Sequence, residues 1–369
     1  VRRLRRLIFN VTTKGATARL PLLLSGTAMH TLSSVKLCFI CIIISVITAC
    51  SPAKPGNEQV QLNGSTMGTY YVVKLYSAHE LDTAALQQQI DTELELVNDL
   101  MSTYRPESEL MRFNRFDSGK AFPLSEQTRV VVAEALRLAE QTNGVLDVTV
   151  GPLVELWGFG AHGRIEHAPD QADIDNARSV VGYQKLTLSA DGLTKSVPQL
   201  AVDLSTIAKG YGVDRVAEIL EQNGIDNYLV EIGGEMRIKG NKPDSQPWKI
   251  AIEKPVNAER SVQRILQTGD MGVATSGDYR NYFEEDGIRY SHLIDPRSGQ
   301  PIQHKTVSAT VLHPSCMTAD GYATALNVMP SEEAIAFANR YNIAALLVVK
   351  TEDGFTELAS DAFKPFLTE

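Results

Sequence analysis

The stretch "VDLSTIAKGYGVD", residues 202–214, joins an apolar run to a pattern typical of an amphipathic helix. We interpret it as a strand that ends at Asp203, followed by a helix over about 206–223. Because the first turn of a helix has free backbone N–H groups and the positive end of the dipole, this arrangement suits a phosphate. The alternative is a capped helix with Lys209 as an ordinary surface lysine. A P-loop is excluded, because the lysine precedes the glycine and no glycine stands at the required place upstream.

Residues 1–49 differ from the rest of the chain, because they contain seven Lys and Arg and no acidic residue. They end in the 13-residue apolar run "LCFICIIISVITA". That run has the length of a signal-peptide core and is shorter than the ~18 residues of a membrane-spanning helix. Cys50 follows, and "ITAC" resembles the lipobox of bacterial lipoproteins, in which the cysteine is acylated. We expect a leader over 1–49, with the true start at Met29, and a lipidated tether over 50–60.

The body of the chain is acidic and poor in cysteine. Removing the seven basic leader residues from 35 leaves 28 against 44 acidic residues, a net charge of −16. This charge disfavours a nucleic-acid partner. Of the four cysteines, Cys38 and Cys41 fall in the leader and Cys50 in the lipobox, so Cys316 is the remaining thiol. One thiol forms neither a disulfide framework nor a thiolate metal site.

The hydrophobic periodicity of the body indicates mixed helices and strands. The expected strands are 69–76, two within 228–240, 248–253, 271–275, 289–294, 308–312 and 343–349, and the expected helices are 86–100, 125–143, 206–223, 318–328 and 331–341. For the second helix we expect Ser125 as N-cap and Gly144 at the C′ position. No regular βαβ rhythm is present, so the pattern predicts an α+β fold with a largely antiparallel sheet.

Two further segments carry side chains suited to chemistry. In "CMTADGYATAL", residues 316–326, Asp320 and Thr324 are four apart, so on a helix both oxygens can reach one hard cation such as Mg²⁺. The alternative is a helix-start aspartate and a packing threonine. In "RYSHLIDPRSGQP", residues 289–301, His292 stands near a strand end and has the pKa range of a general base. The alternative is a half-buried structural histidine.

These segments occur together with others in a recognisable order. The eight motifs are "NGSTMGTYY", "STYRPESEL", "GVLDVTVGPLVELWGFG", "VDLSTIAKGYGVD", "LVEIGGEMRIKG", "VATSGDYRNYF", "SHLIDPRSGQP" and "TADGYATAL". Together they resemble the ApbE family of FAD:protein FMN transferases, which are often periplasmic lipoproteins. We therefore expect an ApbE-like domain over 61–365, with a T-fold-like, mixed and largely antiparallel sheet and packed helices.

The resemblance also implies site residues, carried over where this sequence matches the motifs. The implied FAD-binding residues are Met67, Tyr104, Val145, Leu146, Asp147, Asp203, Lys209 and Ile294. The implied Mg²⁺ ligands are Thr206, Asp320 and Thr324, with the backbone carbonyl of Ala208 nearby, and the implied catalytic residue is His292. Two positions depart from the pattern of some members: Ala323 stands in place of a second aspartate, and Lys209 in place of a glutamate. The metal site thus has one carboxylate fewer, and Lys209 is free to contact the pyrophosphate.

The activity that the resemblance implies is Mg²⁺-dependent transfer of FMN from FAD onto a Thr or Ser of an exported acceptor protein, with release of AMP. The implied acceptors are exported flavoprotein subunits of sodium- or proton-linked respiratory complexes, or other extracytoplasmic flavoproteins. Two other functions stay open: hydrolysis of FAD to FMN and AMP, and FAD binding without catalysis. The expected location is the periplasmic side of a bacterial membrane, anchored through Cys50, with Ser51 favouring the outer membrane over the inner one.

Overall fold

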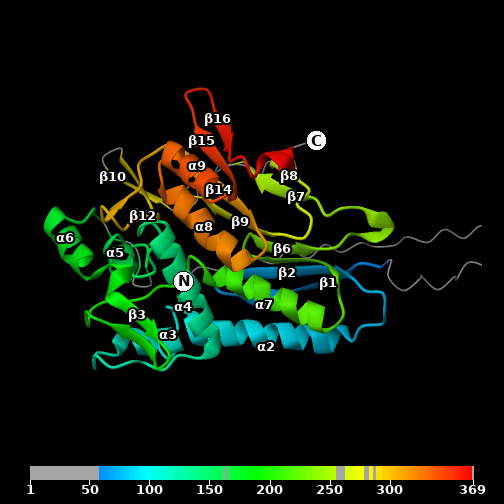
Figure 1. Cartoon of the computed structure of the whole chain (residues 1–369), viewed down its shortest axis with the longest axis horizontal. Coiled ribbons are helices and arrows are strands. Elements are labelled where there is room, and N and C mark those ends of the chain that lie inside the picture. The colour runs from blue at the N-terminus through cyan, green and yellow to red at the C-terminus, as the bar shows by residue number, and fades with distance from the viewer. Residues whose placement is uncertain are drawn as a thin grey trace, which may run out of the picture. The chain divides into compact units, whose positions relative to one another are not determined.

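Eight antiparallel strands form one sheet in the part of the chain that the structure describes (Figure 1). In order across the sheet they are β1 (Val60–Thr66), β2 (Thr69–Tyr76), β5 (Asn227–Ile232), β6 (Glu235–Lys239), β9 (Gly272–Gly277), β14 (Thr306–His313), β15 (Ala344–Lys350) and β16 (Phe355–Ala359). The computed structural model describes residues 58–160, 163, 165, 167–254, 262–277, 282–285 and 288–367. All of them belong to one compact unit, Ala53–Glu369. The α+β fold with a largely antiparallel sheet is confirmed, whereas the expected leader and Cys50 lie outside the described residues.

Smaller strand pairs and helices complete the described part. The pairs are β3 (Leu186–Ser189) with β4 (Gly192–Lys195), β7 (Ile250–Glu253) with β8 (Val262–Leu266), β10 (Tyr282–Glu285) with β11 (Ile288–Ser291), and β12 (Ile294–Asp295) with β13 (Gln300–Pro301). The helices are α2 (Thr83–Met101), α3 (Glu109–Arg115), α4 (Glu126–Gln141), α5 (Gly151–Leu156), α6 (Gln171–Val180), α7 (Ala208–Gln222), α8 (Cys316–Val328) and α9 (Ser331–Arg340), with 3₁₀ turns η2 (Tyr183–Lys185), η3 (Pro243–Ser245) and η4 (Lys364–Leu367). Among the described residues, no helix combines the length and the apolar character that crossing a membrane requires.

The central strands are covered on both faces, and this places α7 and α8 against the sheet. Alternate residues of β5 point to opposite sides. Tyr228 and Val230 pack with apolar residues of α2 and α7, whereas Leu229 packs with Trp248 and the β7–β8 pair. Helix α8 lies against β9 and β14 and also contacts α7 (Figure 1). The two helices that carry the candidate ligand residues are therefore held by the sheet and by each other.

The ends of α4 show how local sequence sets a helix boundary. Ser125 is its N-cap, and its hydroxyl accepts a hydrogen bond from the Thr128 N–H, as expected. The expected C′ residue, Gly144, lies one position further on. Asn143 holds the C′ place with φ 52°, and the Gly144 N–H donates to the carbonyl of Ala139 at 2.8 Å. This is a Schellman turn, in which Asn tolerates the left-handed backbone that glycine usually supplies.

The expected strand before α7 is wrong. Residues 201–204 form no strand, and tertiary hydrogen bonds hold them instead. The Asp203 N–H donates to the Val148 carbonyl at 2.7 Å, and the Val202 N–H donates to Asn114 Oδ1 at 2.8 Å. The apolar character of the run therefore reflects burial against other loops, and the helix begins at Ala208 rather than Thr206.

Candidate functional site

Two neighbouring cavities meet where α7 begins. The first has a volume of about 570 Å³ and lies among the start of α7, the middle of α8, α5 and the β11–β12 segment. The second has a volume of about 920 Å³ and lies between the start of α7, the end of α2 and the β1–β2 turn. Both are lined by Thr103, Tyr104, Asp203, Ser205 and Lys209. Both volumes are in the range of small-molecule sites, and we call the two cavities, which share this wall, the cleft.

One ammonium group faces two buried carboxyl groups at this junction. The Lys209 Nζ atom lies 3.5 Å from Glu235 Oε1 and 3.6 Å from Asp320 Oδ2. Asp320 Oδ2 also accepts a hydrogen bond from the Gly210 N–H at 3.0 Å, so it occupies a donor of the first turn of α7. Lys209 is thus a largely buried ion-pairing residue with 30% of its side chain exposed, and the surface-lysine alternative is wrong.

Burial and charge oppose each other in this cluster. Burial disfavours the charged form of Lys209, but Asp320 and Glu235 outweigh it and raise the pKa of the ammonium group. Burial raises the pKa of Glu235 to about 8, against the opposing effect of Lys209. Burial likewise raises the pKa of Asp320, against Lys209 and the Gly210 N–H. Burial thus disfavours the ionised form of both carboxyl groups, and the ammonium group of Lys209 favours it.

The oxygen atoms around this cluster suit a hard cation. The buried Thr206 Oγ1 and Glu235 Oε2 atoms have no hydrogen-bond partner. Asp320 and Thr324 lie one turn apart on α8, and both line the first cavity. Asp320 is in the second turn of α8, so its interpretation as a helix-start residue is wrong. Among the described residues, no three His, Cys, Asp or Glu side chains gather as a metal cluster. A cation here would therefore depend on hydroxyl, carbonyl and ligand oxygens as well as carboxylates, which is typical of Mg²⁺.

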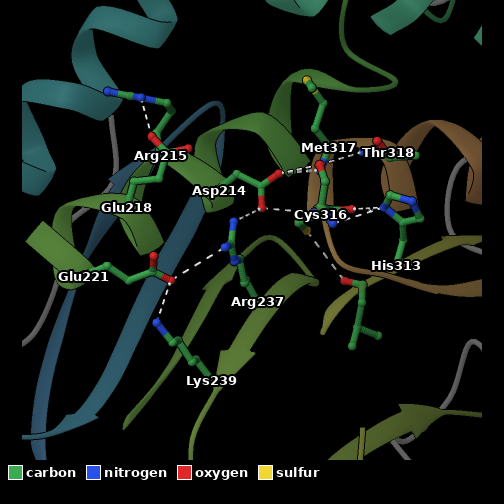
Figure 2. A network of polar contacts seen from close by, with 12 residues as sticks. Asp214, Arg215, Glu218, Glu221, Arg237, Lys239, His313, Cys316, Met317 and Thr318 are labelled. Atoms are coloured by element: carbon green, nitrogen blue, oxygen red, sulfur yellow. Dashed lines mark hydrogen bonds and ion pairs between the residues drawn. The ribbon is translucent and has the colours of Figure 1, made fainter. Parts of the chain in front are cut away.

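Asp214 fixes the position of α8 relative to α7 (Figure 2). Its Oδ1 atom accepts hydrogen bonds from the Cys316 N–H at 3.0 Å and from Arg237 at 2.9 Å. Its Oδ2 atom accepts from the Ser315 hydroxyl at 2.8 Å and the Met317 N–H at 3.0 Å. The carboxylate thus satisfies donors in the first turn of α8 and faces its positive dipole end. Because α7, α8 and β6 all meet at this group, it sets the spacing of Lys209, Asp320 and Glu235.

His292 lies in the short break between β11 and β12, where a single strand was expected. It lines the first cavity, and the ring of Phe159 meets its ring edge-on at 6.3 Å between centroids. Ile294, in β12, lines the same cavity and is buried. The break turns His292 toward the cleft that also contains Asp320, so the structure brings these two expected residues together.

The "GVLDV" segment forms an apolar wall of the first cavity. Val145 and Leu146 are buried and line it. Asp147 lines it too, but its carboxylate is already bonded: it accepts hydrogen bonds from the backbone and hydroxyl of Thr149 and from the Tyr183 N–H. The carboxylate of Asp147 therefore holds the segment in place through these hydrogen bonds.

The remaining expected residues lie around the second cavity. Met67 has φ 49° in the β1–β2 turn and lines that cavity. Tyr104 is 72% exposed and lines both cavities. Asp203 Oδ1 accepts from the Ser205 N–H at 2.8 Å. Ala208, the expected source of a carbonyl ligand, is the first residue of α7 and lines the second cavity.

Sequence reasoning missed Glu235. The motif "GGEMRIKG" drew attention for its glycines, whereas the glutamate that follows them is 4% exposed and lines the first cavity. The available signal was an acidic residue directly after two glycines, at the start of an expected strand. Cys316, the remaining thiol, is fully buried, and burial raises its pKa well above the usual value.

Comparisons with known proteins agree with this geometry. The model of the ApbE family matches residues 67–347. A FAD:protein FMN transferase of Vibrio cholerae is 53% identical over 328 residues, which are 89% of this chain and 98% of that protein. One of Haemophilus influenzae is 46% identical over 337 residues, covering 89% and 97%. The solved flavin transferase ApbE from Vibrio cholerae superposes with a TM-score of 0.79 at 54% identity, covering 84% of this chain and 99% of that one.

These relatives place the chain in one enzyme class, the transferases. The chain belongs to the ApbE family, so the resemblance of its eight motifs is confirmed.

Proposed function

We propose that this chain transfers FMN from FAD to a Thr or Ser hydroxyl of an acceptor protein and releases AMP. Flavin transfer to a protein is the activity that its relatives' names describe. The observation that carries the proposal is the junction of the two cavities at Lys209, beside Asp320 and the unpartnered Thr206 hydroxyl. A dinucleotide has two bulky ends and a charged centre, and this cleft has two chambers and a charged junction.

The oxygen atoms at the junction fit Mg²⁺, and the residues that would hold it are Thr206, Asp320, Thr324 and the Ala208 carbonyl. When bound, Mg²⁺ would neutralise charge on the diphosphate. Lys209 adds a positive charge at the same place. The apolar wall of Val145 and Leu146, with Tyr104 as cover, suits a planar ring system and excludes water from the phosphates.

In the proposed reaction, His292 accepts the proton of the acceptor hydroxyl. The hydroxyl oxygen forms a bond to the phosphorus of the FMN half, and the bond from that phosphorus to the oxygen of AMP breaks. General base catalysis of this kind contributes roughly 10²–10⁴-fold in rate. We expect His292→Ala to retain FAD binding and lose transfer, and Asp320→Ala to lose both activity and Mg²⁺ dependence.

The test is mass spectrometry of an acceptor protein after incubation with the enzyme, FAD and Mg²⁺. A covalent FMN mass on the acceptor supports transfer. Free FMN with AMP and an unmodified acceptor would instead assign FAD hydrolysis, and unchanged FAD would assign a binding protein. An acceptor whose target hydroxyl is replaced by alanine serves as the matched control.

We infer further that the protein acts on the periplasmic side of a bacterial membrane. The support is the leader pattern over 1–49 and the lipobox-like "ITAC" ending at Cys50. Exported subunits of respiratory complexes are then the acceptors within reach. Cys50→Ser is expected to release the protein from the membrane fraction, and an unchanged membrane fraction for that variant contradicts the lipid anchor.

A further inference from the structure

We propose that Glu235 is the second carboxylate of the cation site at the start of α7. This inference rests on the proposed function, since it concerns the cation that assists transfer. Glu235 contributes its charge and its unpartnered Oε2 atom to the cation, in addition to the contribution of Asp320.

The position of Glu235 supports this role. Its side chain is 6% exposed, and both it and Asp320 contact the same Lys209 Nζ atom, at 3.5 and 3.6 Å. Both carboxyl groups line the first cavity. Both carboxylates therefore contact one cationic group, and a divalent ion bound at Asp320 is within electrostatic reach of Glu235.

A second, independent observation points to a ligand. Glu235 Oε1 faces Lys209, whereas the buried Oε2 atom has no partner. Leaving such an atom unsatisfied is costly, unless a cation or its bound water occupies the position when the site is filled. Mg²⁺ usually retains several water molecules, so Glu235 Oε2 can contact the ion either directly or through one of its waters.

The charges of the neighbouring side chains give Glu235 a role. Ala323, next to Thr324 on α8, is 1% exposed in the apolar core and contributes no charge. One ammonium group already compensates one of the two remaining carboxylates. If Glu235 is left out, the pair of Asp320 and Lys209 presents no net charge to a cation. The Glu235 carboxylate adds one negative charge beside this pair, and that charge attracts a divalent ion.

The test compares Mg²⁺ binding and FAD binding separately, each by titration calorimetry of the full chain without an acceptor. We expect Glu235→Gln to lower Mg²⁺ affinity about tenfold, the effect of removing one unit charge from the neighbourhood of a divalent ion. FAD affinity without Mg²⁺ is expected to be equal or higher, because the dinucleotide is an anion. Glu235→Asp keeps the charge and is expected to stay within a few-fold of the parent protein.

The matched control is Glu357→Gln, which removes an ion-paired carboxylate on β16, 2.7 Å from Arg264. It is expected to leave Mg²⁺ affinity unchanged, and far-ultraviolet circular dichroism reports whether each variant is folded. Unchanged Mg²⁺ affinity in Glu235→Gln, or equal weakening of Mg²⁺ and FAD binding, would overturn the inference and assign Glu235 a structural role. If the parent protein binds FAD, the proposed function stands whether or not Glu235→Gln weakens Mg²⁺ binding. If the parent protein binds neither FAD nor Mg²⁺, the proposed function and the role of Glu235 are both refuted.

Discussion

Replacing Asp214 by asparagine is expected to destabilise the protein by about 1–4 kcal/mol. The asparagine oxygen can replace only one carboxylate oxygen, so either the Met317 N–H or the Cys316 N–H loses its acceptor, at about 1–3 kcal/mol. The positive dipole end of α8 also loses its negative charge, at about 0.3–1 kcal/mol. The bond to Arg237 weakens, but Arg237 keeps Glu221 as a second partner at 3.6 Å, which limits this contribution.

The assay is guanidinium chloride unfolding followed by circular dichroism, with the slope of the free energy against denaturant compared between variants. Glu221→Gln is the control, because it removes a partner of Arg237 and leaves the α8 contacts of Asp214 unchanged. It is expected to cost less than about 1 kcal/mol, since Glu221 is partly exposed. A loss below about 0.5 kcal/mol for Asp214→Asn, or equal losses for the two variants, would show that Asp214 does not hold α8 in place.

Three other perturbations have definite expected results. In Gly210→Ala, the new Cβ would lie 2.4 Å from the Cys316 carbonyl oxygen, so α7 and α8 must separate; we expect a loss of about 1–3 kcal/mol in denaturant unfolding, and an unchanged midpoint contradicts the close contact. Burial lowers the pKa of His313, which lies beside Glu134, Arg137 and Asp214, so below about pH 6.5 the unfolded chain binds a proton more readily than the folded chain and stability decreases. His313→Gln is expected to reduce this decrease. The free energy of unfolding is measured against pH for both proteins, and equal slopes would refute the prediction. Thr206→Val removes an unpartnered buried hydroxyl, so we expect equal or higher stability with weaker Mg²⁺ binding in calorimetry, and unchanged binding would exclude Thr206 from the cation site.

The sequence predicted those elements whose burial pattern is local. The spacing of Leu86, Ile90 and Leu94 marked α2, and a serine with suitable flanking residues marked the start of α4. The segment before α7 was misassigned, because its apolar residues are buried by contacts with Val148 and Asn114, which are distant in the sequence.

The sequence predicted the site residues that lie close together on one helix, but not the contacts between distant segments. The four-residue spacing of Asp320 and Thr324 on one helix is visible in the sequence, and the structure places both in the cleft. The contact of Lys209 with Glu235 depends on how β6 lies beside α7, which no sequence window contains. Similarly, the hydrogen bond that the Asp147 carboxylate accepts from the Tyr183 N–H could not be predicted, because the two residues are 36 positions apart.

The contact between the Gly210 N–H and Asp320 joins residues 110 positions apart. During synthesis on the ribosome, the residues around Val145 and Met67 emerge long before α8. A chain truncated ahead of Cys316 would lack Asp320 and Thr324, together with the α8 residues that pack with Val145 and Leu146 in the core. Proteolytic loss of the C-terminal part is consequently expected to abolish cation binding at once rather than by degrees.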